Sequence, residues 1–230
     1  SDVYKTKNAE ELLDKRRIDA VVIATPTNTH YSLAKLALES RIHTFVEKPL
    51  ATKSSECEKL INIADKNKLV LFVGHVFLYN NAVRTMKKLI DDGELGKVIH
   101  INANRRNLGP VRQDVNALWD LAPHDISIIL ELLGRLPVSV NCQGLAYLKD
   151  GVHDVCSLTL HFNDSCMATI NVSWLDPNKN RLMTIVGDKK MAVFDDNHQL
   201  EKIKIFYKSV NCIRYTNVSY DDFQFSNRYV

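Results

Sequence analysis

The sequence lacks any apolar run long enough to cross a bilayer, which takes about 20 consecutive apolar residues. Its first residues, 1–5, contain no apolar core and so do not resemble a secretory signal peptide. The sequence also lacks a large excess of charge of one sign: it has 30 Lys and Arg residues and 27 Asp and Glu residues, a net charge of +3. This balance gives no basis for nucleic-acid binding. What is present, 45% hydrophobic and 25% charged residues in a chain of 230, is typical of a globular protein with one large or two modest domains.

Paired cysteines are also missing. The five cysteines are odd in number, widely spaced and form no C-x-x-C motif: Cys57, Cys142, Cys156, Cys166 and Cys212. Metal sites need clustered ligands at characteristic spacing, and because the sequence shows none we expect no metal. The pattern favours reduced, mostly buried thiols in a cytoplasmic protein.

The first third of the chain alternates buried strands with amphipathic helices. Three short apolar runs predict strands buried on both faces: residues 20–24, 43–46 and 69–73. A helical repeat of apolar residues follows the first strand from Leu33 onward, and an S-x-x-E capping box at Ser55 and Glu58 predicts the start of a second helix. Strands and helices in this alternation imply a parallel sheet with right-handed crossovers.

The pattern changes after residue 76. Helices are predicted at residues 81–92, ended by Gly93, and at 123–133, with Pro123 in the first turn and Gly134 past the end. Strand patterns dominate the remainder: residues 97–106, 155–162, 167–174, 182–186, 191–194 and 203–207, with a hairpin turn at 163–164. The predicted fold is therefore a partial Rossmann-like, parallel-sheet domain over 1–76, followed over 77–230 by an α+β domain. That second domain is an open, mainly antiparallel sheet with helices on one face.

Two motifs follow strands of the parallel sheet, at the edge where ligands bind in open α/β sheets. The first is A-T-P-T-N-T-H at residues 24–30, for which a capped turn is the simpler explanation. The second is Glu47-Lys48-Pro49. A lysine at a strand end is usually a solvated surface group, but here it can point into the ligand crevice. A cis Lys48–Pro49 bond would direct the ammonium there, and a cation beside a reacting hydroxyl stabilises the developing alkoxide.

The third motif is the pair Asp120 and His124, four residues apart and hence on one face of a helix. Imidazole suits general-base catalysis near neutral pH, and a carboxylate one turn away can orient it. The simpler alternatives are a helix N-cap for Asp120 and a partly buried helix residue for His124.

In this order and spacing the motifs resemble the glucose-fructose oxidoreductase / inositol dehydrogenase (Gfo/Idh/MocA) family: A-T-P-x-x-x-H, E-K-P, G-H after the next strand and D-x-x-x-H at a helix start. The resemblance covers nearly the whole chain. The stretch 107–120 is especially similar to a subgroup that acts on nucleotide-linked sugars, such as UDP-N-acetylglucosaminuronate 3-dehydrogenases.

The resemblance implies an NAD- or NADP-dependent enzyme that moves a hydride between nicotinamide and a hydroxyl carbon of a sugar or nucleotide-linked sugar. It also implies a homodimer or homotetramer formed through the antiparallel sheet. Lys48 and His124 match the catalytic residues, flanking one sugar ring across a shared cleft, with Asp120 as orienting partner. The resemblance places these residues against the cofactor: Thr25, Pro26, Asn28, His30, Glu47, Lys48 and Pro49. It places these against the substrate: Lys48, Arg105, Asn107, Asp120 and His124. Arg112 and Gln113 are further candidates for a cofactor contact, in the same or a neighbouring subunit.

The sequence departs from the family pattern at both ends. None of its eight glycines forms a G-x-G-x-x-G turn, no ribose selector follows a second strand, and residues 220–230 resemble the stretch before a final helix. We therefore expect both termini to be truncated relative to the family. Because the glycine turn holds the pyrophosphate on a helix N-terminus, we expect weak cofactor binding by these residues alone. The alternative function is a non-catalytic family member that serves as a binding or oligomerisation module.

Overall fold

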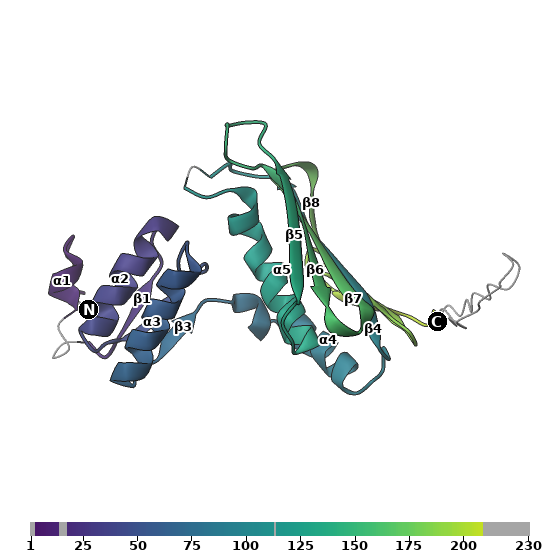
Figure 1. The fold of residues 1–230 in the computed structure, drawn as a ribbon, viewed down its shortest axis with the longest axis horizontal. Coiled ribbons are helices and arrows are strands. Elements are labelled where there is room, and N and C mark those ends of the chain that lie inside the picture. Colours follow the sequence, from purple (N-terminus) through teal and green to yellow (C-terminus); the bar gives the residue numbers. More distant parts are fainter. Residues whose placement is uncertain (1–2, 14–17, 113, 209–230) are drawn as a thin grey trace, which may run out of the picture. The chain divides into compact units, whose positions relative to one another are not determined.

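The computed structural model describes residues 3–13, 18–112 and 114–208. The chain divides into two compact units, Ser1–His75 and Val76–Val230 (Figure 1). Within the described ranges, every helix is too short or too polar to pass through a bilayer.

The first unit is built on a three-stranded parallel sheet in the order β1-β2-β3, as the sequence predicts. Two helices connect the strands and pack against each other, and a short helix precedes the first strand. In chain order the elements are α1 (Ala9–Leu12), β1 (Ala20–Ile23), α2 (Thr27–Glu39), β2 (His43–Val46), α3 (Ser54–Asn67) and β3 (Leu71–Val73).

One face of this sheet forms the core of the unit. Ile23 and Val46 pack there with apolar residues of the two helices: Ala34, Leu38, Leu60 and Ala64. The opposite face carries a row across the three strands, in which Val22 is 68% exposed and the rings of Phe45 and Phe72 stack 5.3 Å apart. The sheet is thus buried on one face, whereas the sequence predicts burial on both.

The predicted capping box is wrong. Helix α3 begins at Ser54, its N-cap is Lys53, and no side chain caps it, so Ser55 lies inside the first turn. The S-x-x-E spacing is local and recurs wherever Ser and Glu occur near a helix start, so it did not fix the first residue of the helix.

The second unit is a seven-stranded sheet in the order β10-β9-β8-β4-β7-β6-β5. β4 and β7 run parallel and the other neighbours pair antiparallel, which confirms the mainly antiparallel sheet. Its elements are η1 (Val76–Tyr79), α4 (Asn81–Asp91), β4 (Val98–Leu108), α5 (Ala117–Leu133), β5 (Ser139–Leu145), β6 (Val155–Phe162), η2 (Asn163–Ser165), β7 (Cys166–Ser173), β8 (Leu175–Gly187), β9 (Met191–Asp195) and β10 (Ile203–Phe206).

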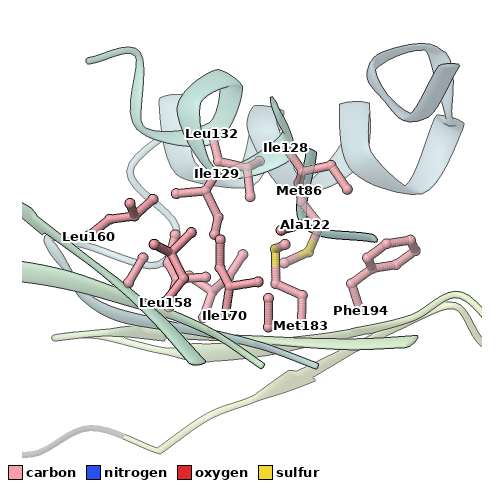
Figure 2. Close-up of a cluster of buried hydrophobic side chains, with 14 of the residues drawn as sticks. Met86, Ala122, Ile128, Ile129, Leu132, Leu158, Leu160, Ile170, Met183 and Phe194 are labelled. Carbon is pink, nitrogen blue, oxygen red and sulfur yellow. The ribbon is translucent and has the colours of Figure 1, made fainter. Parts of the chain in front are cut away.

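The core of the second unit lies between the sheet and the helices α4 and α5. Figure 2 shows side chains of the two helices facing side chains that rise from the sheet. The labelled residues come from α4 (Met86), α5 (Ala122, Ile128, Ile129, Leu132), β6 (Leu158, Leu160), β7 (Ile170), β8 (Met183) and β9 (Phe194). This packing fixes α5 against the centre of the sheet, and α5 carries Asp120 and His124.

Helix α5 begins earlier than the sequence predicts. It starts at Ala117, so Pro123 lies in the second turn rather than the first. An interior proline removes one helical hydrogen bond, which is why the prediction put it at the helix start. The earlier start is stabilised by two contacts: the Asn116 side chain accepts the Trp119 N–H at 3.0 Å, and the His153 carbonyl accepts the Ala117 N–H at 2.9 Å. The end at Gly134, with φ of 63°, is as predicted.

Candidate functional site

Three loops of the first unit lie at the carboxyl edge of its parallel sheet. They follow β1 at Thr25, β2 at Glu47 and β3 at Gly74. The Glu47 N–H donates to the carbonyl of Ile23 at 2.9 Å, and the Gly74 N–H to that of Val46 at 2.8 Å, so each loop is tied to the end of the neighbouring strand. Of the predicted cofactor contacts, Thr25, Pro26 and Asn28 are exposed, and Glu47, Lys48 and Pro49 are half-buried.

His30, which the sequence places against the cofactor, is enclosed between two loops. It is 1% exposed, and its two ring nitrogens lie between backbone carbonyls of two loops. Nδ1 is 2.7 Å from the Pro49 oxygen and Nε2 is 2.9 Å from the Thr25 oxygen. A side chain enclosed in this way joins the loop after β1 to the loop that carries Lys48. These contacts favour a structural role for His30 over the predicted contact with a cofactor.

Replacing His30 by phenylalanine will destabilise the first unit by about 1–3 kcal/mol, because the buried ring is kept while the hydrogen bond from its N–H to a loop carbonyl is lost. Amide hydrogen exchange in peptides from residues 20–73 measures the change. Ser32→Ala removes an exposed hydroxyl that bonds the Thr29 carbonyl on the same helix, and it should change stability by less than about 0.5 kcal/mol. Equal protection in His30→Phe and the unmodified chain would contradict the linking role.

Glu47, Lys48 and His75 gather at the same edge. A Cβ on Gly74 would lie 3.0 Å from Oε2 of Glu47, so the carboxylate closely approaches the backbone at Gly74. The Lys48–Pro49 bond is cis. Burial, and then the positive charge of Lys48, lowers the pKa of His75, which keeps this imidazole neutral near pH 7. A lysine and a neutral imidazole therefore lie near one another beside the carboxylate of Glu47.

In the second unit, His124 lies one turn after Asp120 on α5, so the two share a helix face as predicted. The half-buried His124 ring meets the edge of Phe77, with centroids 5.0 Å apart at 65°. Phe77 is covered in turn by the Arg105 guanidinium, 4.6 Å from its ring centroid. Phe77 thus links His124 to a buried ion pair.

That ion pair joins Arg105 of β4 to Asp125 of α5, both 4% exposed. Arg105 donates from Nε at 2.8 Å and from Nη2 at 3.0 Å to the two carboxylate oxygens, the bidentate geometry that arginine favours. The sequence predicts that Arg105 meets the sugar. The structure instead commits its guanidinium to Asp125 and Phe77, which favours a supporting role beneath His124.

Asp120 accepts a hydrogen bond on each carboxylate oxygen. Nη1 of Arg112 donates to Oδ1 and the indole of Trp174 donates to Oδ2, both at 3.2 Å. Arg112 also binds Asp114 at 2.9 and 2.6 Å, and these contacts, with the charge of Asp120, raise the pKa of Arg112. Arg112 thus has its observed partners within its own unit, and its contact with a cofactor stays a prediction. Asn116, and not Asp120, is the N-cap.

Asn107 and Gln113 are the remaining residues that the sequence places at the site. Asn107 is half-buried near the end of β4, and Gln113 lies outside the described residues. Sequence reasoning missed His75, Phe77 and Trp174. His75 belongs to the G-H motif that supports the family resemblance, but nothing in the sequence assigns it a role. The contact of Phe77 with His124 and that of Trp174 with Asp120 join residues more than 40 positions apart, for which a single sequence offers no signal.

Among the residues that the structure describes, thiols and metal-ligating groups form no second site. In the described parts, no three His, Cys, Asp or Glu side chains converge so as to hold a metal ion. Four cysteines are free there; Cys156 and Cys166 are buried, Cys57 is half-buried and Cys142 is exposed. Burial raises the pKa of Cys156 to about 11, so its thiol stays protonated near neutral pH.

Comparison with known protein families accounts for both units. Residues 1–75 match the model described as "Oxidoreductase family, NAD-binding Rossmann fold", and residues 83–193 match the "GFO/IDH/MocA C-terminal domain". The chain belongs to the Gfo/Idh/MocA oxidoreductase family. The resemblance found in the motifs is thereby confirmed, as is the fold class predicted from them.

Individual members of the Gfo/Idh/MocA family are similar over most of the chain. UDP-N-acetylglucosamine 3-dehydrogenase from Acidithiobacillus ferrooxidans is 29% identical over 181 residues, which cover 77% of this chain and 56% of that protein. Its crystal structure matches with a TM-score of 0.76, over 89% of this chain and 65% of the other. A protein from Magnetospirillum magnetotacticum MS-1, described as an oxidoreductase, matches with a TM-score of 0.79 at 29% identity, over 87% and 64%.

Family membership does not fix one reaction. The 2,7-anhydro-N-acetylneuraminate hydratase of Mediterraneibacter gnavus is also similar, at 25% identity over 177 residues, covering 70% of this chain and 47% of that enzyme. The chain spans about half the length of the curated relatives that it matches.

Proposed function

We propose that this chain provides the catalytic part of an oxidoreductase that moves a hydride between NAD or NADP and a hydroxyl carbon of a sugar, with a nucleotide-linked sugar as the substrate class. The observation that carries the proposal is the start of α5, where His124 follows one turn after a carboxylate held by two donors. Membership of an oxidoreductase family and similarity to a nucleotide-sugar dehydrogenase support it.

In this proposal each catalytic side chain has one task. The imidazole of His124 takes the hydroxyl proton as the sugar carbon is oxidised and returns it in the reverse direction. The ammonium of Lys48 stabilises the negative charge that develops on the oxygen. Asp120 supplies a fixed negative charge beside the imidazole. The cofactor supplies the hydride exchange when it is bound.

The loop after β1 fits the nicotinamide half of such a cofactor. Thr25, Pro26 and Asn28 are exposed at the start of α2, and the N-cap Pro26 makes no side-chain hydrogen bond to the helix. The positive end of the helix dipole therefore faces a polar, open loop, which favours a negative or polar ligand group. Glu47, with its carboxylate against Gly74, is suited to accept hydrogen bonds from ribose hydroxyls.

The open face of the seven-stranded sheet is the surface we propose for homo-oligomer formation. Opposite the helices it carries a hydrogen-bonded group of polar side chains. Asn102 donates to Thr169 at 2.7 Å and Asn104 to Asn102 at 2.6 Å. These half-buried amides are uncharged and have partners within the sheet, which suits pairing with a second copy of the same chain.

Turnover with a nicotinamide cofactor tests the proposed function. We expect the chain, given NAD or NADP at high concentration with UDP-N-acetylglucosamine, to accumulate reduced cofactor. The rate should exceed that with myo-inositol or free N-acetylglucosamine by at least about tenfold, because only the nucleotide sugar offers the remote groups whose binding energy assists the reaction. No cofactor reduction with any sugar would contradict the proposal and favour a non-catalytic binding module.

A lysine pair provides the matched control for this assay. Lys48→Met should lower the rate by about a hundredfold, because the cation that stabilises the alkoxide is lost. Lys53→Met, at an exposed position five residues further on, should leave the rate unchanged. Equal rates in both variants would remove Lys48 from the proposed mechanism.

A further inference from the structure

Trp174 connects two segments of the second unit. It follows β7 directly and is only 1% exposed, the largest of the fully buried side chains. Its backbone N–H donates to the Asp154 carbonyl at 3.0 Å, and its indole Nε1–H donates to Oδ2 of Asp120 at 3.2 Å. One residue of the sheet therefore binds both the loop before β6 and the helix that carries His124.

The Asp154 end of this connection is rigid. Asp154 is fully buried, and its Oδ2 accepts the backbone N–H groups of Tyr147 at 2.7 Å and Leu148 at 2.9 Å. The Asp154 N–H donates in turn to the Leu145 carbonyl at 2.8 Å, so the residue that accepts the Trp174 N–H is itself bonded through its side chain and its backbone. Trp174 is therefore held by a backbone hydrogen bond to Asp154 at one end and by its indole hydrogen bond to Asp120 at the other.

The Asp120 carboxylate is restrained from opposite sides. Trp174 holds one oxygen and Arg112 holds the other, and the Asp120 side chain is only 19% exposed. Rotation of the carboxylate would break one of the two hydrogen bonds. Because both oxygens already accept, Asp120 is suited to act as a fixed charge and acceptor, which leaves proton transfer to His124 on the next turn.

Burial alone does not account for a tryptophan at this position. A buried indole needs an acceptor for its N–H, and an apolar ring such as phenylalanine fills space without that requirement. The acceptor here is a carboxylate on the candidate catalytic helix. The hydrogen bond therefore adds a directional contact to what packing alone supplies.

We propose that Trp174 is a positioning residue: its indole N–H, with Arg112 on the opposite oxygen, holds the Asp120 carboxylate in the orientation that His124 requires. This inference rests on the proposed function, because it assigns Trp174 to the same reaction.

The hydrogen bond is tested without turnover. The chain has two tryptophans, Trp119 and Trp174, so a proton–nitrogen correlation spectrum contains two indole N–H signals, which Trp174→Phe assigns. Asp120→Asn exchanges a charged acceptor for a neutral one and should move the Trp174 signal much further than that of Trp119. An unmoved Trp174 signal would overturn the proposal, whatever the chain catalyses.

The role in catalysis is tested by kinetics. Trp174→Phe keeps an aromatic ring and removes the N–H; we expect kcat to fall about tenfold, with KM for the sugar changed less than about twofold. The matched control Trp119→Phe removes the indole of the other tryptophan, which is 41% exposed, and should keep its turnover. In an Asp120→Ala background, Trp174→Phe should have no further effect, because the group it positions is gone.

The outcomes separate this inference from the proposed function. An equal loss from Trp174→Phe in both backgrounds would mean that the ring matters only for packing, and would overturn the positioning role. Full turnover in Trp174→Phe would overturn it as well. Absence of turnover in the unmodified chain would count against the proposed function itself.

Discussion

Replacing Asp125 by alanine will lower the free energy of unfolding of the second unit by about 3–5 kcal/mol. Asp125 and Arg105 are both 4% exposed, and two hydrogen bonds of 2.8 and 3.0 Å join them. Without the carboxylate, a guanidinium remains buried with no counter-charge. The Phe77 ring beneath it offers a weak attraction that cannot compensate for lost hydration.

Urea unfolding followed by tryptophan fluorescence measures this loss. The two tryptophans of the chain, Trp119 and Trp174, both belong to the second unit, so the signal reports that unit. For an m-value of about 2 kcal/mol per molar, the midpoint should fall by about 2 M. The control Asp92→Ala removes the same group from an exposed pair with Lys88, where the side chains are 75% and 50% exposed, and should cost less than about 0.5 kcal/mol.

A double variant identifies the origin of the loss. Arg105→Met combined with Asp125→Leu removes both charges and keeps the volume, so most of the stability lost in Asp125→Ala should return. A loss in Asp125→Ala below about 1 kcal/mol would mean that another group neutralises the guanidinium, and would contradict the buried-pair argument.

The ion pair between Arg105 and Asp125 could have been predicted from the sequence by combining the two-residue repeat of the strand with the helical repeat of α5. On β4, the alternate residues Ile101, Ala103 and Arg105 face the core. On α5, the buried residues Ile128, Ile129 and Leu132 lie three, four and seven positions after Asp125. Both charged residues therefore occupy core positions of their elements, where charges persist only when paired. The prediction that Arg105 meets the substrate was based on its charge and did not use its position in the alternation of buried and exposed residues along β4.

The parallel sheet and the β6–β7 hairpin could be predicted because their signals are local. Apolar runs mark β1 and β2, and Asn163 with Asp164, whose φ is 67°, marks the hairpin turn. β5 escaped prediction because Val140 and Cys142 alternate with polar residues only briefly before Gly144, and all seven residues of the strand are exposed. Periodicity detects a strand through its buried face, and an edge strand of this kind has none.

The candidate site was predictable in its residue types and less so in its contacts. Motif order identified Lys48, Asp120 and His124, and the structure puts Asp120 and His124 on one helix face. Lys48 belongs to the first unit and His124 to the second, so their joint action on one sugar stays a prediction. The linking role of His30 depends on a carbonyl 19 residues away, and that of Trp174 on a carboxylate 54 residues away. Contacts between distant segments leave no periodic trace.

Replacing His124 by asparagine will lower kcat by about 10²–10⁴-fold, the usual contribution of a general base. The amide keeps a polar group at the same point of α5 but cannot accept the hydroxyl proton. Because the effect falls on proton transfer, KM for the sugar should change far less than kcat. Steady-state kinetics with UDP-N-acetylglucosamine measure both. His198→Asn, in the exposed loop before β10, makes the same chemical change away from α5 and should keep the full rate.

Chemical rescue separates a lost base from a disturbed helix. His124→Ala leaves a space beside the Phe77 ring, whose edge contact with the imidazole would be vacated. Added imidazole should enter that space and restore part of the rate, in proportion to its concentration, because it returns the proton acceptor without the covalent link. A variant that loses activity, keeps its tryptophan fluorescence and urea midpoint, and is not rescued would show that His124 acts by holding the substrate and not by moving the proton.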